Sequence, residues 1–377
     1  MYSKKPRRPD NRPTSRWRHV RHGALLLAIW VALTELLLRV FAANYMADRY
    51  RCCTGDPALC LIGLAHQMNT QFPELTTDPH RIFRHDPVLG HRLMPNLSNV
   101  LYKGGLVSTN DHGVRGHAPH PYERVDGRRR FVVVGDSYTM GQEVNDQQTW
   151  AAVLESLDPT REVINLGTSA YGIDQATLMM REEGLRYRPD VVLFGYFRDD
   201  LYRDMSAFAC SSKPQFVERG DRLVLEGVPV PSPEALRSRI RRTPFLWQFW
   251  RYFRDHPHKA EPTIDASNAL GHRILSLAAE MSQTRGARLV LVHLPDVFAF
   301  MHEPEWRDPF FTRACTIPGV VCVDPLPRMR AELARTGRSA HEAFFRIHHY
   351  NPHGNQVVAE AVDAWLRENP ASAHGPP

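Results

Sequence analysis

The sequence lacks several patterns that would define its chemistry at once. No glycine-rich fingerprint follows its first short apolar run, residues 131–134, which argues against a dinucleotide-binding oxidoreductase. The six cysteines show no paired C-x-x-C spacing, which argues against a zinc site. Internal repeats and low-complexity blocks are absent. We therefore predict neither a cofactor nor a metal.

Acidic residues are nearly missing from residues 1–22, where Asp10 is the single one. The eight basic residues there give this tail a balance of +7, while the whole chain carries +6, so the remainder lies near −1. The high pI therefore belongs to the tail, and we predict no nucleic-acid surface on the folded part. The basic residues of the tail are Lys4, Lys5, Arg7, Arg8, Arg12, Arg16, Arg18 and Arg21.

Residues 23–43 form an apolar run about long enough to cross a bilayer. Glu35 and Arg39 interrupt it at a spacing of four, so they can pair, and Arg39 can reach the interface. With the basic tail before it, this run predicts a single-pass anchor with residues 1–22 in the cytoplasm and the rest in the periplasm, outside the inner membrane. A cleaved signal peptide ending at residues 40–42, which would release a secreted protein, and an amphipathic helix of a soluble protein are the alternatives.

The even number of cysteines fits an oxidising compartment. Cys315 and Cys322 could close a small loop around residues 318–319, and two of the first three cysteines could join likewise. If the predicted topology is wrong, isolated reduced cysteines are the alternative. The other cysteines are Cys52, Cys53, Cys60 and Cys210.

With 377 residues and 43% hydrophobic content, the chain can bury a large core and fits one catalytic-size domain with additions. We predict an irregular extracytoplasmic extension at 44–125, a main domain at 126–370 and a tail at 371–377. Within the main domain, residues 205–262 break the pattern and form an insertion. This insertion is rich in aromatic residues, and we interpret it as a lid or substrate wall.

Apolar β-branched runs alternate with helical patterns through the main domain. This alternation predicts an α/β fold with a parallel sheet covered on both faces. The expected strands are 131–134, 162–166, 190–197, 287–294 and 319–323, and the expected helices are 146–157, 173–187, 264–284 and 354–368.

Ser137 follows the first strand at a tight turn led by Gly135. In an open α/β sheet the reacting groups collect at the carboxyl ends of the strands, so a serine there is presented to a crevice. The residue is therefore either a nucleophile or part of a hydrogen-bonding Asp-Ser turn.

Several segments together resemble the SGNH, or GDSL, hydrolase family over most of residues 85–368. The segments are Gly135-Asp136-Ser137, Asn165-Leu166-Gly167-Thr168-Ser169 and His348-His349-Tyr350-Asn351-Pro352-His353-Gly354, preceded by Asp86-Pro87-Val88-Leu89-Gly90 and Asn110-Asp111-His112-Gly113-Val114-Arg115-Gly116. The last two are similar to the entry segment of membrane-anchored bacterial members. The resemblance implies a three-layer α/β/α domain with a mostly parallel, flavodoxin-like sheet.

The same resemblance implies roles for particular residues. Ser137 would be the nucleophile and His349 its general base, while the backbone N–H groups of Ser137 and Gly167 would bind the oxyanion. Two positions depart from the family pattern. Asp199 stands where an Asn side-chain amide is expected in the oxyanion hole, and Ile347 stands where an Asp usually orients the histidine.

Each departure leaves alternatives open. Arg198 could compensate for Asp199, the carboxyl could be held protonated, or the loop could be one residue out of register. His349 could be oriented by a backbone carbonyl, by His348, or by a carboxylate from elsewhere such as Glu342.

These observations predict a membrane-anchored serine esterase that acts through an acyl-enzyme on an O-acyl group, such as an O-acetyl group, of cell-envelope or exported polysaccharide. The glycan substrate follows from the topology and the resemblance alone. An O-acetyltransferase would use the same acyl-enzyme. A catalytically impaired module that binds a glycan or a partner in envelope assembly is the alternative from another class.

Overall fold

The computed structural model describes residues 15–44, 82–124, 127–209, 211–232, 263–300 and 309–370, together with scattered residues between 234 and 254. Several sequence predictions lie outside these residues: the basic tail before residue 15, residues 45–81 of the extension, the tail at 371–377, and the cysteines Cys52, Cys53, Cys60 and Cys210.

A five-stranded parallel sheet forms the centre of the main domain. Its strands run in the order β13-β12-β7-β5-β6. If the five strands are numbered 1 to 5 along the chain, the order from the β6 edge is 2-1-3-4-5. This is the flavodoxin-like order, and the predicted α/β fold is confirmed. The strands are β5 (Arg129–Val134), β6 (Arg161–Asn165), β7 (Val191–Tyr196), β12 (Arg288–His293) and β13 (Val320–Val323).

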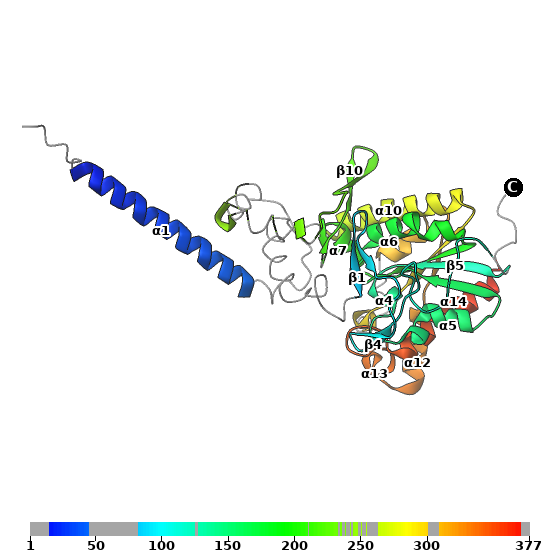
Figure 1. Ribbon diagram of the computed structural model, residues 1–377. Helices are drawn as coiled ribbons and strands as arrows, with labels where there is room; N and C mark the ends of the chain where they lie inside the picture. The colour runs from blue at the N-terminus through cyan, green and yellow to red at the C-terminus, as the bar shows by residue number, and fades with distance from the viewer. Residues whose placement is uncertain are drawn as a thin grey trace, which may run out of the picture.

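Helices cover both faces of the sheet, as Figure 1 shows. Alternate side chains of β5 point to opposite faces, so Val132 and Val134 join the core under one helical layer while Phe131 and Val133 join the other. The first layer holds α6 (Ile173–Glu182), α7 (Asp200–Asp204), α10 (Ile264–Thr284) and α11 (Pro309–Ala314); the second holds α5 (Trp150–Ser156), α12 (Leu326–Thr336), α13 (Ala340–Phe344) and α14 (Pro352–Glu368).

Most predicted elements lie within two residues of the observed ones, and α10 has the predicted bounds. Two predicted helices are split by a change of helical type. Residues 146–157 form a 3-10 turn (Asp146–Gln148) before α5, and residues 173–187 form α6 and then a second 3-10 turn (Gly184–Tyr187). The helices α11, α12 and α13 were not predicted from the sequence; α11 and α13 have six and five residues, and among the eleven residues of α12 only Met329 is buried.

Two small hairpins precede the sheet, where the sequence analysis expected irregular structure. They consist of β1 (Phe83–Asp86) with β2 (Gly90–Leu93), and β3 (Val100–Tyr102) with β4 (Gly105–Val107). Strands of three or four residues are too short to reveal an alternating pattern. Their apolar side chains form a separate cluster that includes Met140 of the main domain, so the extension packs beside the segment that follows Ser137.

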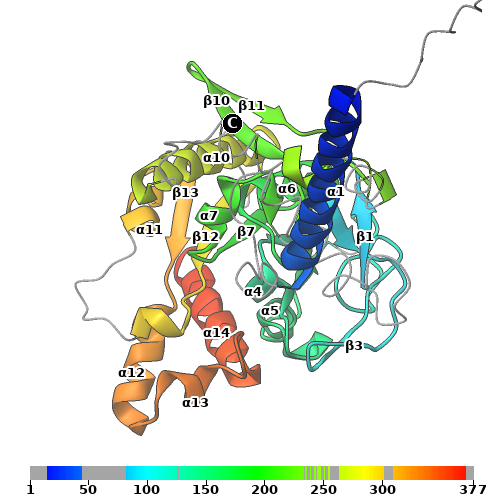
Figure 2. The same cartoon turned by 90° about the vertical axis from the view of Figure 1, so that its left-hand side faces the viewer.

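The N-terminal helix α1 (Ser15–Asn44) extends away from the main domain (Figures 1 and 2). Its segment Trp17–Val40 has a mean hydropathy of 1.9 and none of its most apolar window is buried. Length and composition make it able to cross a membrane. The helix is therefore a candidate membrane span or signal sequence.

The insertion begins with two antiparallel pairs, β8 (Phe208–Ala209) with β9 (Ser211–Ser212), and β10 (Gln215–Arg219) with β11 (Arg222–Glu226). The β10–β11 hairpin projects from the domain in Figure 2. Farther along, Phe245 contacts α1. The predicted pairing of Cys315 with Cys322 is confirmed by a disulfide that closes the loop between α11 and β13.

Candidate active site

Ser137 begins α4 (Ser137–Met140), the short helix that follows β5. Gly135 makes the turn possible: its φ is 153°, and a Cβ there would lie 2.3 Å from Thr139 Oγ1. Asp136 caps the helix by accepting a hydrogen bond from the Tyr138 N–H at 2.9 Å. The predicted Asp-Ser turn therefore exists, and it places Ser137 at the carboxyl edge of the sheet.

His349 lies beside Ser137, as its place in the last motif predicts. Its Nε2 is 2.9 Å from Ser137 Oγ, within reach for proton transfer. His349 sits in the loop before α14, and that helix is capped by Asn351, which accepts from the Gly354 N–H at 2.8 Å. The loop is also held by Tyr138, whose hydroxyl donates to the His348 carbonyl at 2.8 Å.

The side chain that contacts the imidazole of His349 belongs to Glu143. This residue was not among those predicted from the sequence. Its Oε1 lies 3.1 Å from His349 Nδ1, and its Oε2 accepts from the Ile347 N–H at 2.9 Å. A carboxylate can only accept, so Nδ1 carries the hydrogen and Nε2 is left to accept from the Ser137 hydroxyl. Ile347 thus contributes its backbone, while its side chain is 63% exposed.

Among the described residues, none of the alternative orienting groups forms a hydrogen bond with the imidazole of His349. Glu342 instead accepts from Ser339 within the capping box of α13. Glu143 lies six residues after Ser137. This spacing alone could not identify it from the sequence, because a single glutamate in a loop is common.

The charge of Glu143 is stabilised locally. Burial by itself raises its pKa, but hydrogen bonds from His349 and from the Ile347 N–H outweigh that effect and lower the pKa to about 2. Glu143 also has a φ of 72°, a left-handed conformation that is uncommon for residues other than glycine. Such backbone strain persists only where the surroundings impose it.

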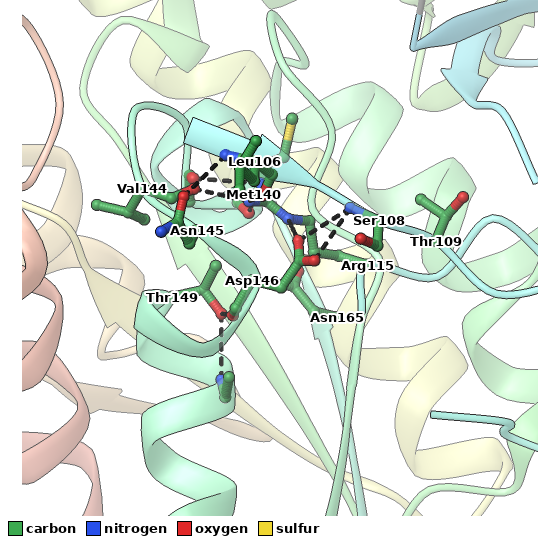
Figure 3. Close-up of polar contacts among 12 residues, drawn as sticks. Leu106, Ser108, Thr109, Arg115, Met140, Val144, Asn145, Asp146, Thr149 and Asn165 are labelled. Atoms are coloured by element: carbon green, nitrogen blue, oxygen red, sulfur yellow. Dashed lines mark hydrogen bonds and ion pairs between the residues drawn. The ribbon is translucent and has the colours of Figure 1, made fainter. Parts of the chain in front are cut away.

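Arg115 imposes the shape of this loop (Figure 3). Its guanidinium donates to the carbonyls of Met140, Gly141 and Val144 at 2.8–3.2 Å, on both sides of Glu143. The same group pairs with Asp146 at 2.8 Å, and Asp146 in turn accepts from the Ser108 N–H. The side chain of Arg115 is 1% exposed. The motif at residues 110–116 therefore supplies a buried side chain that holds the loop carrying Glu143. The contacts within the cluster also include Leu106 and Asn145.

A second charged cluster lies beneath Ser137. Arg203 bridges Asp136 at 3.2 Å and Asp200 at 2.5 Å, and Ser137 Oγ lies 3.3 Å from Asp136 Oδ2. Complete burial raises the pKa of Asp200 well above its ordinary value, and the nearby Asp136 carboxylate acts in the same direction. The Arg203 guanidinium thus forms ion pairs with both Asp136 and Asp200, next to Ser137.

Gly167 does not offer its amide to the site, contrary to the prediction from the resemblance. Its N–H donates to Asn165 Oδ1 at 2.9 Å, and a Cβ at Gly167 would lie 2.4 Å from Met140 N, so the residue packs under α4. The same loop continues to Ser169, whose hydroxyl donates to Gln142 Oε1 at 2.9 Å. The next residue, Ala170, has a φ of 66°, and within the described part of the chain its N–H makes no hydrogen bond.

Asp199 occupies the N-cap position before α7, at the carboxyl end of β7, and is exposed. Among the described residues its carboxylate makes no hydrogen bond, and it does not cap the helix. The neighbouring Asp200 has the opposite environment, because it is buried and accepts from the Phe197 N–H at 3.1 Å. An exposed carboxylate therefore stands at the position where the resemblance implies an amide.

A cavity of about 550 Å³ adjoins this loop on the side of β12 and β13. Phe197 lines this cavity, and its ring stacks on that of Tyr138, the residue after Ser137, at a centroid distance of 4.7 Å. Its polar wall includes Arg198, Asp296 and the His293–Asp324 pair, whose Nδ1 and Oδ1 atoms are 2.9 Å apart. In the described ranges, no group of three or more His, Cys, Asp or Glu side chains is arranged to hold a metal ion.

Comparison with known proteins gave similarities to solved structures only. No protein-family model and no curated protein matches the chain. A lipolytic protein of the G-D-S-L family from Desulfitobacterium hafniense DCB-2 is similar at 13% identity and a TM-score of 0.39, covering 63% of this chain and 99% of its own. The acetyl xylan esterase AlAXEase is similar at 12% identity and a TM-score of 0.39, with coverages of 63% and 99%. A catalytic mutant of an acetylxylan esterase from Geobacillus stearothermophilus is similar at 13% identity and a TM-score of 0.39, with coverages of 65% and 96%.

Proposed function

We propose that the chain is a serine esterase of the SGNH type, in which Ser137, His349 and Glu143 act as a catalytic triad. The observation that carries this proposal is the pair of contacts made by one imidazole, 2.9 Å from Ser137 Oγ and 3.1 Å from Glu143 Oε1. This is the nucleophile, base and orienting acid relationship that activates a hydroxyl.

The reaction proceeds in two acyl transfers. His349 Nε2 takes the hydroxyl proton as Ser137 Oγ attacks the ester carbonyl carbon, and the imidazolium then gives that proton to the departing alcohol oxygen. Water, deprotonated by the same nitrogen, attacks the acyl-serine, and the carboxylic acid leaves as Ser137 regains its proton. Glu143 stays ionised throughout and stabilises the imidazolium.

The oxyanion requires donors, and we assign two backbone groups to this role. The Ser137 N–H opens α4, where no preceding carbonyl of the helix can accept from it. The second is the N–H of Ala170, in place of the occupied N–H of Gly167. Asp199 provides no amide at the third position, and removal of one such donor typically costs about 10²–10³ in rate.

The substrate class follows from the resemblance and from the apolar helix before the domain. We propose an O-acyl group, such as an O-acetyl group, on cell-envelope or exported polysaccharide, with the domain anchored by α1 on the periplasmic side of the inner membrane. Transfer of the acyl group to a sugar hydroxyl instead of water would use the same acyl-serine. Measuring free acetate against acetylated acceptor, with an acetylated oligosaccharide as donor, separates the two.

A fluorophosphonate probe tests the nucleophile directly. We expect covalent labelling of the full chain at Ser137, no labelling of Ser137→Ala, and turnover of p-nitrophenyl acetate that the same substitution abolishes. Asp199 favours the impaired glycan-binding module as a second candidate function. Absence of labelling together with equal hydrolysis by Ser137→Ala would leave that module as the better description.

A further inference from the structure

Glu35 in the apolar helix α1 contacts the insertion of the main domain. Its two carboxylate oxygens accept from the backbone N–H groups of Phe245 and Leu246, at 2.8 and 3.0 Å. These contacts join positions about 210 residues apart in the chain. A carboxylate in an apolar helix is costly unless it is paired, so its retention here requires a partner.

Arg39 completes this junction. Its Nε donates to Glu35 Oε1 at 2.7 Å, and its guanidinium lies over the ring of Phe245, 4.6 Å from the centroid. Phe245 is only 3% exposed. Glu35 thus binds a cation on its own helix and two N–H donors on the insertion, which fixes the insertion against α1. A signal peptide removed after residue 42 would take this docking site with it.

The junction defines a depth relative to the proposed membrane. The apolar segment of α1 ends at Val40, five residues beyond Glu35, so Glu35 lies roughly 7–8 Å inside that end at 1.5 Å per residue. Interfacial segments bury their apolar faces about 5–10 Å into the boundary between headgroups and acyl chains. Phe245 is therefore held at the level of that boundary.

The side chains that follow have the character of an interfacial segment. Trp247 and Trp250 are 51% and 49% exposed and stack on each other at 4.7 Å, and Arg254 lies over Trp250 at 4.5 Å. Indole rings prefer the headgroup level of a bilayer. Basic residues are frequent in the surrounding sequence, at Arg237, Arg239, Arg241, Arg242, Arg251 and Arg254.

We propose that the part of the insertion that carries Phe245, Trp247 and Trp250 forms a second membrane contact. There Trp247 and Trp250 insert among anionic phospholipid headgroups next to α1, and the contact is held in place by Glu35. This inference rests on the proposed membrane anchor but not on the esterase activity. It also replaces the interpretation of these aromatic residues as a lid or substrate wall. A domain held to the bilayer at two places cannot swing freely about α1, so its orientation to the membrane surface is restricted.

Depth-dependent quenching of tryptophan emission tests the proposal. The full chain carrying Trp17→Phe and Trp30→Phe, which removes the indoles of α1, is placed in nanodiscs of phosphatidylglycerol and brominated phosphatidylcholine. We expect bromines near the headgroup to quench more strongly than bromines near the chain ends. Adding Trp247→Phe and Trp250→Phe should reduce the shallow quenching at least roughly twofold, because these rings lie at that level.

Matched variants separate the possible causes. Trp365→Phe, on α14, should leave the shallow quenching unchanged, since Trp365 packs against Arg288. Glu35→Leu should lower it, whereas Thr34→Leu should not, because the Thr34 hydroxyl bonds only within α1, to the Trp30 carbonyl.

The outcomes distinguish failure of the second membrane contact from failure of the proposed membrane anchor or of the proposed esterase activity. Unchanged quenching after loss of both indoles, in a chain that resists extraction by alkaline carbonate, would overturn the second contact and leave the anchor standing. Extraction by carbonate would overturn both. Hydrolysis of p-nitrophenyl acetate by the same nanodiscs reports on the esterase proposal independently.

Discussion

The carboxylate of Glu143 lies 3.1 Å from Nδ1 of His349, although 206 residues separate them in the chain. In the proposed triad this contact supplies the orienting acid that Ile347 cannot provide. It also links the loop that follows Ser137 to His349, because Glu143 follows Ser137 by six residues.

We predict that Glu143→Gln lowers kcat for p-nitrophenyl acetate by about 10²–10⁴-fold, as expected when the orienting acid of a triad is replaced by its amide. Glu342→Gln is the matched control, since Glu342 is exposed and serves only its own helix, and it should retain normal kcat. Initial rates and circular dichroism of both variants check the prediction. A Glu143→Gln enzyme within twofold of the parent would remove Glu143 from the triad.

The low pKa of Glu143 predicts a pH dependence of stability. Its pKa is about 2 in the folded protein against 4.5 for the ordinary group, so the unfolded chain takes up the proton first as the pH falls. The stabilisation is therefore full above pH 4.5 and is lost between pH 4.5 and about 2. Urea titrations of the parent and Glu143→Gln should show a difference that shrinks over this range, and a difference independent of pH would contradict the assignment.

Arg115 is expected to support catalysis without touching substrate. Arg115→Met removes the cation that pairs with Asp146 and the donor of three loop carbonyls, and breaking a buried pair in this way costs about 3–5 kcal/mol of folding free energy. Arg219→Met, in an exposed pair with Glu226, should cost little. Urea midpoints measure the stability.

A second readout separates positioning from stability alone. Well below the unfolding transition, Arg115→Lys should lower kcat more than it changes KM, because the loop with Glu143 loses its forked support. A parallel change in both constants, or in neither, would contradict a positioning role.

Asp199→Asn tests the missing oxyanion donor. The substitution removes a negative charge and adds an N–H donor at the third position of the motif, so we expect kcat to rise, by about tenfold or more if the amide reaches the oxyanion. Asp199→Ala removes the charge alone and serves as the comparison. If Asn and Ala have equal effects, charge rather than hydrogen bonding is responsible, and if neither raises kcat, Asp199 lies outside the oxyanion site.

Much of the fold was predictable because buried parallel strands and long helices have strong local patterns. The apolar run that ends at Val134 and the 21 residues of α10 carry such patterns. The hairpins β1–β4 and the helices α11 and α13 do not, because segments of three to six residues are too short to show a period. The Cys315–Cys322 pair could be proposed from its spacing because its loop is short.

The site divides in the same way. The sequence by itself indicated Ser137, because a glycine-led turn follows a buried strand there, and the resemblance to the SGNH family indicated His349. Tertiary structure alone decided that Glu143 contacts the imidazole of His349 and that Glu35 binds the insertion. These outcomes depend on which loops the folded sheet brings together, and contacts over such separations leave no local periodicity in the chain.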